Sequence, residues 1–181
     1  TIAKVLAGVK GVDTVIPGHS TVMTWQNFGA FGEFTRAFLT AVQDAKKAGK
    51  TVGGHYASPD LGLPFHAYVA GGPADDHEGT RVEHAVARVR QGMRAMLRLG
   101  SAWFDVAPQI KAITEQGLDS RNFILCTDDV HSGTLVGEGH MDRAVRHAIA
   151  QGLKPMTAIQ MASLNTATHF GLERELGSIT P

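Results

Sequence analysis

The chain of 181 residues lacks the features that several classes of protein require. It has a single cysteine, Cys126, which excludes an intramolecular disulfide framework and is typical of a reducing compartment. Lysine plus arginine and aspartate plus glutamate number 17 each, and this balance disfavours a nucleic-acid or anionic-membrane partner. No apolar run approaches the roughly 20 residues of a membrane span, and the first residues lack a signal pattern. We therefore expect a soluble, cytoplasmic protein.

The chain contains many hydrophobic residues, glycines and histidines. Hydrophobic residues make up 43% of the sequence, which is enough to bury the core of one domain or of two small ones. Its 21 glycines and nine histidines suit an enzyme with tight loops around a metal or an acid/base site.

Short apolar runs alternate with longer helical patterns along the chain. This alternation predicts an α/β fold of about five βα units, with a parallel sheet and outer helices. Thr80 and Glu83 are spaced as a capping box, and Pro155 suits the first turn of a helix. The expected strands are residues 12–16, 51–55, 74–77, 94–98 and 123–127, and the expected helices are residues 28–48, 61–70, 80–91, 106–116, 142–150 and 156–164.

Histidines and aspartates follow four of the predicted strands. They are His19, His55, His77 and the pair Asp128 and Asp129. Functional side chains of parallel sheets collect where strands end, and imidazole with carboxylate suits zinc, manganese or iron. The pattern therefore favours a divalent-metal site at this edge of the sheet.

Each of these residues also has a plainer interpretation. A single histidine is more often a surface or hydrogen-bonded residue than a ligand, and Asp128 and Asp129 could cap a turn. The segment 75–78 (DDHE) is either part of a site or an exposed loop. Cys126 is expected to be a buried apolar residue rather than a nucleophile. The histidines at 84, 147 and 169 lie in predicted helices, where we expect them to face solvent or the core edge.

Residues 45–181 resemble the C-terminal half of the catalytic barrel of adenine deaminases in the amidohydrolase superfamily. The resemblance rests on the stretches AGKTVGGH, LPFHAYVAGGPADDHEGT, RQGMRAMLRLGSA, ILCTDDVH, EGHMDRAVRHAIAQG, TAIQMASLNTATHFGL and LGSITP. It implies a partial (βα)8 barrel of the TIM type. It also implies metal-assisted hydrolysis of adenine to hypoxanthine and ammonia, with manganese or iron favoured and zinc as an alternative.

The resemblance also implies roles for individual residues. His55 and His77 match metal ligands that follow the fifth and sixth barrel strands, and Asp128 matches the eighth-strand aspartate that binds metal and shuttles the proton. The other expected pocket residues are Glu78 and His131 in catalysis and Ser101 and Asp129 in substrate binding. The chain lacks the family's first-strand His-x-His pair and its fourth-strand glutamate.

Residues 1–52 resemble something else, namely the C-terminal segment of a metallo-β-lactamase-fold hydrolase. The stretch VDTVIPGHSTVMTW carries this resemblance, and His19 in its PGH motif would be a late metal ligand. We expect His19 to take part of the ligand role of the missing residues. The expected domains are therefore residues 1–52 and an adenine deaminase-like half barrel of residues 53–181.

The leading interpretation is a metal-dependent hydrolase similar to adenine deaminase. Two alternatives stay open, namely a metallo-β-lactamase-fold hydrolase and an inactive fragment that only self-associates. Because five βα units cannot close an eight-stranded barrel, sheet edges would stay exposed, and we expect a homo-oligomer.

Overall fold

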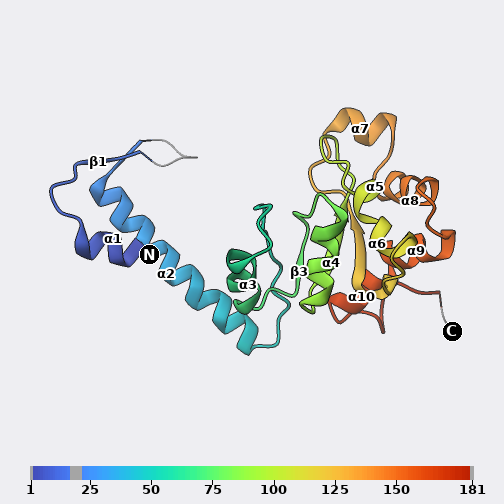
Figure 1. The fold of residues 1–181 in the computed structure, drawn as a ribbon, viewed down its shortest axis with the longest axis horizontal. Helices are drawn as coiled ribbons and strands as arrows, with labels where there is room; N and C mark the ends of the chain where they lie inside the picture. Colours follow the sequence, from blue (N-terminus) through green and yellow to red (C-terminus); the bar gives the residue numbers. More distant parts are fainter. Residues whose placement is uncertain (1, 17–21, 180–181) are drawn as a thin grey trace. The chain divides into compact units, whose positions relative to one another are not determined.

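The computed structural model describes residues 2–16 and 22–179 and divides the chain into two compact units, Thr1–Lys50 and Thr51–Pro181 (Figure 1). His19 lies outside the described residues, so its predicted ligand role stays a prediction. Within the described part of the chain, no helix has both the length and the apolar character needed to cross a bilayer.

The first unit consists of two helices and a short hairpin. Its elements are α1 (Ile2–Gly8), β1 (Thr14–Val15), β2 (Met23–Thr24) and α2 (Trp25–Lys47). Helix α2 begins at Thr24, whose hydroxyl accepts a hydrogen bond from the Asn27 backbone N–H, and it ends before Gly49, which has a φ of +74°. The strand expected at residues 12–16 is present but pairs antiparallel with β2, so the expectation of a parallel βα unit here is wrong.

The second unit is built on three parallel strands in the order β3-β4-β5, which confirms the predicted α/β class with a parallel sheet. Its elements are α3 (Leu63–Ala70), β3 (Asp75–Asp76), α4 (Val82–Arg90), β4 (Arg94–Arg98), α5 (Val106–Gln109), α6 (Lys111–Thr114), the 3-10 turn η1 (Ser120–Asn122), β5 (Phe123–Cys126), α7 (Ser132–Gly137), α8 (Met141–Ala150), α9 (Pro155–Ala162) and α10 (Leu164–His169).

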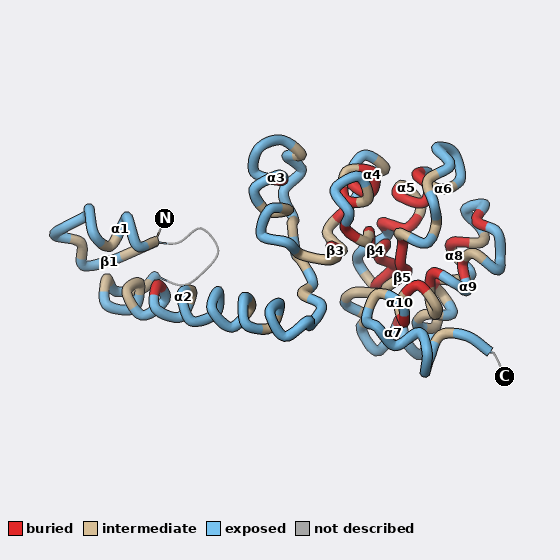
Figure 2. The backbone as a smooth tube through the Cα atoms, turned by 90° about the horizontal axis from the view of Figure 1, so that it is seen from below, coloured by how far each residue is buried: buried red, intermediate tan, exposed pale blue. Residues whose placement is uncertain are grey.

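The apolar core lies between one face of this sheet and its helices. Ala95 and Leu97 of β4 and Phe123 and Leu125 of β5 are almost fully buried against residues of α4, α5, α6, α8 and α9. Figure 2 shows that the buried residues are concentrated around β4 and β5. Because successive side chains of a strand point to opposite faces, Arg98 points to the face away from this core.

Among the described residues the parallel sheet has three strands, not the five that we expected. Residues 51–55 form no ladder with β3, and one backbone–backbone hydrogen bond, from the Ala74 N–H to the Val52 carbonyl (2.9 Å), joins this segment to the chain just before β3. Gly54 lacks a Cβ for a steric reason, because a Cβ there would lie 2.5 Å from the Asp75 carbonyl oxygen. The segment therefore packs closely against β3 without the regular pairing of a strand.

Two expectations about helix ends have opposite outcomes. The capping box of Thr80 and Glu83 is wrong, because Arg81 is the N-cap of α4 and Thr80 donates its backbone N–H to His84 Nδ1 instead. Pro155 does occupy the first turn of α9, as expected. The helix expected at residues 106–116 is divided into two single turns, α5 and α6.

Of the three histidines that we expected to face solvent or the core edge, His84 is buried, whereas His147 and His169 are of intermediate exposure. His147 should make stability depend on pH. His147 on α8 has a buried Nε2 without a hydrogen-bond partner, and burial, helped by Arg143, lowers its pKa below 6.5. Below pH 6.5 the unfolded chain then takes up a proton that the folded chain does not, so the free energy of unfolding falls as the pH falls.

The prediction is that chemical denaturation between roughly pH 8 and pH 5 shows this loss, and that His147→Gln reduces its slope. Part of the slope should remain, because burial also lowers the pKa of His84. His66→Gln is the control, because His66 is an exposed histidine on α3 and its replacement should leave the slope unchanged. An identical slope in wild type and His147→Gln would contradict the prediction.

Candidate metal centre

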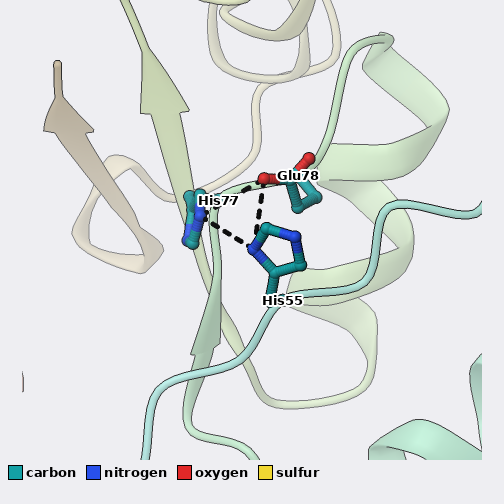
Figure 3. A group of neighbouring side chains, drawn as sticks. All are labelled: His55, His77 and Glu78. Atoms are coloured by element: carbon teal, nitrogen blue, oxygen red, sulfur yellow. Dashed lines mark hydrogen bonds and ion pairs between the residues drawn. The ribbon is translucent and has the colours of Figure 1, made fainter. Parts of the chain in front are cut away.

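Three of the predicted site residues, His55, His77 and Glu78, converge at the end of β3 (Figure 3). The distances from His55 Nδ1 to His77 Nε2, from His55 Nδ1 to Glu78 Oε1 and from His77 Nε2 to Glu78 Oε1 are all 3.3 Å. The three donor atoms thus form an equilateral triangle, with the two imidazole rings edge to face at 5.1 Å between centroids.

This donor set fits a divalent transition metal. Two ligand atoms about 2.1 Å from a tetrahedral metal lie about 3.4 Å apart, close to the spacing seen here. Two imidazoles and one carboxylate are also ligands that zinc, manganese and iron accept. The His55 side chain is 68% exposed and the Glu78 side chain 12%, so the triangle opens to solvent on the histidine side.

The local sequence explains how two separate segments meet here. His77 and Glu78 come directly after β3, and His55 directly follows Gly53 and Gly54 at the end of segment 51–55. The backbone N–H of Gly54 donates to Asp75 Oδ1 (3.3 Å), which fixes this segment to β3. Small residues before His55 therefore let its backbone approach the strand that carries the other two ligands.

Arg98, at the end of β4, connects this triangle with the predicted catalytic aspartate. Its Nη1 donates to Glu78 Oε1 at 2.9 Å and to Asp128 Oδ2 at 2.8 Å, and its Nε donates to Asp105 Oδ2 at 2.9 Å. Burial alone would lower the pKa of the guanidinium, but the hydrogen bonds to Asp128 and Asp105 outweigh it and raise the pKa. Its ring partner is Trp103, 4.5 Å from the guanidinium carbon.

Asp128 does not belong to the donor triangle but shares the Arg98 nitrogen with it. Its φ of +56° is the single left-handed value of a non-glycine residue in residues 2–16 and 22–179. Aspartate tolerates this region better than most residues, and such backbone values are frequent at functional sites. Asp129 follows it, with its N–H bonded to Asp128 Oδ1 (2.9 Å).

Ser101 and His131 lie next to each other, and both hydrogen-bond to neighbouring residues of the chain. Ser101 Oγ accepts the His131 backbone N–H (2.9 Å) and donates to Thr134 Oγ1 (3.0 Å). His131 is the N-cap of α7, and its Nδ1 accepts the Thr134 N–H (3.2 Å). The backbone carbonyl of Asp129 in turn accepts the Ser101 N–H (2.9 Å), so these three residues form one loop cluster beside Asp128.

Cys126 is not a candidate nucleophile. Burial raises the pKa of its thiol to about 12, with a further contribution from Asp128, so the thiol stays protonated near neutral pH. The raised pKa agrees with the expectation that Cys126 is not a nucleophile, although the residue is of intermediate exposure and not fully buried. Arg98, by contrast, was missed by the sequence analysis, although a charged residue at the carboxyl end of an apolar strand was a signal that could have found it.

Comparison with known proteins identifies the family. A model of the amidohydrolase family matches residues 9–181. The chain belongs to the amidohydrolase family. It is 66% identical over 180 residues to an adenine deaminase of Mesorhizobium japonicum, a match that covers 94% of this chain and 30% of that protein. It is 69% identical over 168 residues to adenine deaminase 3 of Rhizobium meliloti, with 88% of this chain and 28% of that protein covered.

More distant amidohydrolase relatives match as well. An adenine deaminase of Clostridium botulinum is 49% identical over 140 residues, which cover 77% of this chain and 23% of that protein. The chain therefore spans less than a third of the length of these curated relatives. The family match also includes residues 9–52, and the metallo-β-lactamase resemblance that we expected there is not shown.

The contact between Gly100 and the Asp128 loop of this amidohydrolase leads to a prediction. A Cβ at Gly100 would lie 2.5 Å from the carbonyl oxygens of both Thr127 and Asp129. Gly100→Ala should therefore displace this loop and lower the free energy of unfolding by about 1–3 kcal/mol, the usual cost of overpacking.

Urea denaturation measures the change, with Gly137→Ala as the matched control, since an added Cβ at Gly137 meets no atom within 4 Å. Equal stabilities of Gly100→Ala and wild type would contradict the close approach of Gly100 to the carbonyl oxygens of Thr127 and Asp129.

Proposed function

We propose that this amidohydrolase chain supplies metal-ligand and proton-transfer residues for the hydrolysis of adenine to hypoxanthine and ammonia. The triangle of His55, His77 and Glu78 is the observation that carries the proposal, because its 3.3 Å spacings suit a divalent metal. The names of the relatives support adenine as the substrate, since the three similar proteins described above are adenine deaminases.

The proposed metal ligands are His55, His77 and Asp128, with Glu78 added by the geometry and His19 kept from the sequence analysis. Manganese or iron is the metal that we favour, with zinc as the alternative. A bound divalent metal supplies a water nucleophile near neutral pH. Arg98 neutralises one of the carboxylates that gather here and fixes the direction in which Asp128 presents its Oδ2.

We assign proton transfer to Asp128, Glu78 and His131. In this assignment the Asp128 carboxylate accepts a proton from the attacking water, and a pocket acid protonates the amino group so that it leaves as ammonia. Glu78 lies within 2.9 Å of the same Arg98 nitrogen as Asp128, which supports a shared proton-transfer role. Ser101 and Asp129, in the loop cluster beside Asp128, are the proposed contacts with the purine.

The proposed architecture is part of a (βα)8 barrel, with residues 53–181 as an adenine deaminase-like half barrel. Two features support it, namely the parallel order β3-β4-β5 and the helices packed against a single face of the sheet. In such barrels the catalytic groups lie at the carboxyl ends of the strands, as His77, Arg98 and Asp128 do here. The homo-oligomer and the cytoplasmic location expected from the sequence stay predictions.

The test of the proposed function is metal content by elemental mass spectrometry after reconstitution of the full chain with Mn²⁺, Fe²⁺ or Zn²⁺. Near-stoichiometric metal is expected in wild type and in the control His66→Ala, and its loss is expected in His77→Ala. Ammonia release from adenine by the metal-loaded chain should then fall by on the order of 10²–10⁴ in Asp128→Asn, because a positioned proton acceptor is removed. Background metal in wild type would instead support the inactive-fragment alternative.

A further inference from the structure

The two aspartates that precede His77 are buried, which decides a question that the sequence left open. Asp76 is fully buried and Asp75 is 3% exposed, so residues 75–78 are not an exposed loop. The partner of Asp76 is Arg88 on α4, itself 1% exposed, at 2.7 Å from Asp76 Oδ1. A buried ion pair of this kind is costly to form unless hydrogen bonds satisfy both groups.

The hydrogen bonds of Asp76 lead directly to the two ligand-bearing segments. Its Oδ2 accepts the backbone N–H of Tyr56 at 2.5 Å, and Tyr56 is the residue after His55. Its Oδ1 accepts the backbone N–H of Glu78 at 2.9 Å. One buried carboxylate therefore holds the backbone of both segments that form the donor triangle.

Arg88 also bonds directly to the segment that carries His55. Its Nη2 donates to the Tyr56 carbonyl at 3.1 Å, so the N–H and the C=O of Tyr56 are both fixed by one ion pair. Asp75 holds the residue on the opposite side of His55, because it accepts the Gly54 N–H. The Asp75 carboxylate is in turn bonded to the His169 side chain at 2.5 Å.

We propose that Asp76, with Arg88 as its counter-ion, is the positioning residue that holds His55 opposite His77 and Glu78. Residues 51–56 form no strand ladder with β3, so regular pairing does not set the place of His55. The hydrogen bonds of Asp76 and Arg88 take over that task. The consequence for metal affinity rests on the proposed function, whereas the consequence for the distance between the two histidine rings does not.

A purely structural role of the ion pair makes a different prediction. In that case any substitution that destabilises the second unit would disturb the site in proportion to the stability lost. Two variants separate the alternatives. Leu97→Ala on β4 and Met161→Ala on α9 each create a cavity in the apolar core, and neither removes a hydrogen bond to Asp76.

The experiment measures ring proximity and metal affinity in the full chain. The first readout is the nuclear Overhauser effect between the ring protons of His55 and His77 without metal, and the second is the dissociation constant for Mn²⁺ and Zn²⁺. Asp76→Asn leaves Arg88 unpaired and offers one acceptor oxygen in place of two. We expect loss of the ring-proton effect and a dissociation constant about 10–100-fold higher, as for other residues that orient metal ligands.

Arg88→Lys covers the case in which Asp76→Asn does not fold. A lysine keeps the charge opposite Asp76 but lacks the planar fork that also reaches the Tyr56 carbonyl, so a weakened ring-proton effect is expected. Met161→Ala and Leu97→Ala should keep both readouts while lowering the melting temperature.

Each outcome decides the matter. An unchanged ring-proton effect in folded Asp76→Asn or Arg88→Lys, or equal losses in Leu97→Ala, overturns the positioning role. A third outcome is a ring-proton effect that is present in wild type and lost in Asp76→Asn, in a protein that binds no metal. This outcome supports the positioning role and contradicts only the proposed metal site.

Discussion

The parallel pairing of β3, β4 and β5 places the carboxyl ends of three strands at one edge of the sheet. The register sets Asp76 beside Ala95 and Arg98 beside Cys126, so the residues that follow β3 and β5 come out next to the end of β4. Arg98 can then reach Glu78 on one side and Asp128 on the other. None of these groups is close to the others in sequence, and the pairing of the strands is what makes them neighbours.

Two buried arginines, on opposite faces of this sheet, compensate the acids at that edge. Asp76 pairs with Ala95 of the core face, and its carboxylate is met by Arg88 from α4. Arg98 points to the other face and forms ion pairs with Glu78, Asp105 and Asp128. Arginine suits both positions because its planar fork bonds several acceptors at once and stays charged when buried. The core face thus carries the ion pair of Asp76 and Arg88, and the other face carries Arg98 with its three carboxylates.

The sequence predicted those parts of the structure that depend on local pattern. The bounds of β4 and the first turn of α9 followed from apolar periodicity and from Pro155. The rule that strand ends gather led us to expect His55 near His77, and the two do meet, although residues 51–55 form no strand. The capping box at Thr80 failed because His84 Nδ1 offers the Thr80 N–H a better-placed acceptor. Segment 51–55 failed as a strand because its contacts with β3 are made through the Asp75 and Asp76 side chains, which no alternation pattern records.

The charges around Arg98 give a physical reason for a divalent cation at this edge. Arg98 contacts the carboxylates of Glu78, Asp105 and Asp128, and its single positive charge leaves a formal excess of two negative charges. Partly buried carboxylates repel each other when they are not compensated. His55 and His77 add neutral nitrogen donors on the solvent side, at distances that a metal can bridge. A divalent ion there would balance the acids without displacing Arg98, whereas a second arginine or a lysine would balance only half of the excess and supply no ligand positions for water.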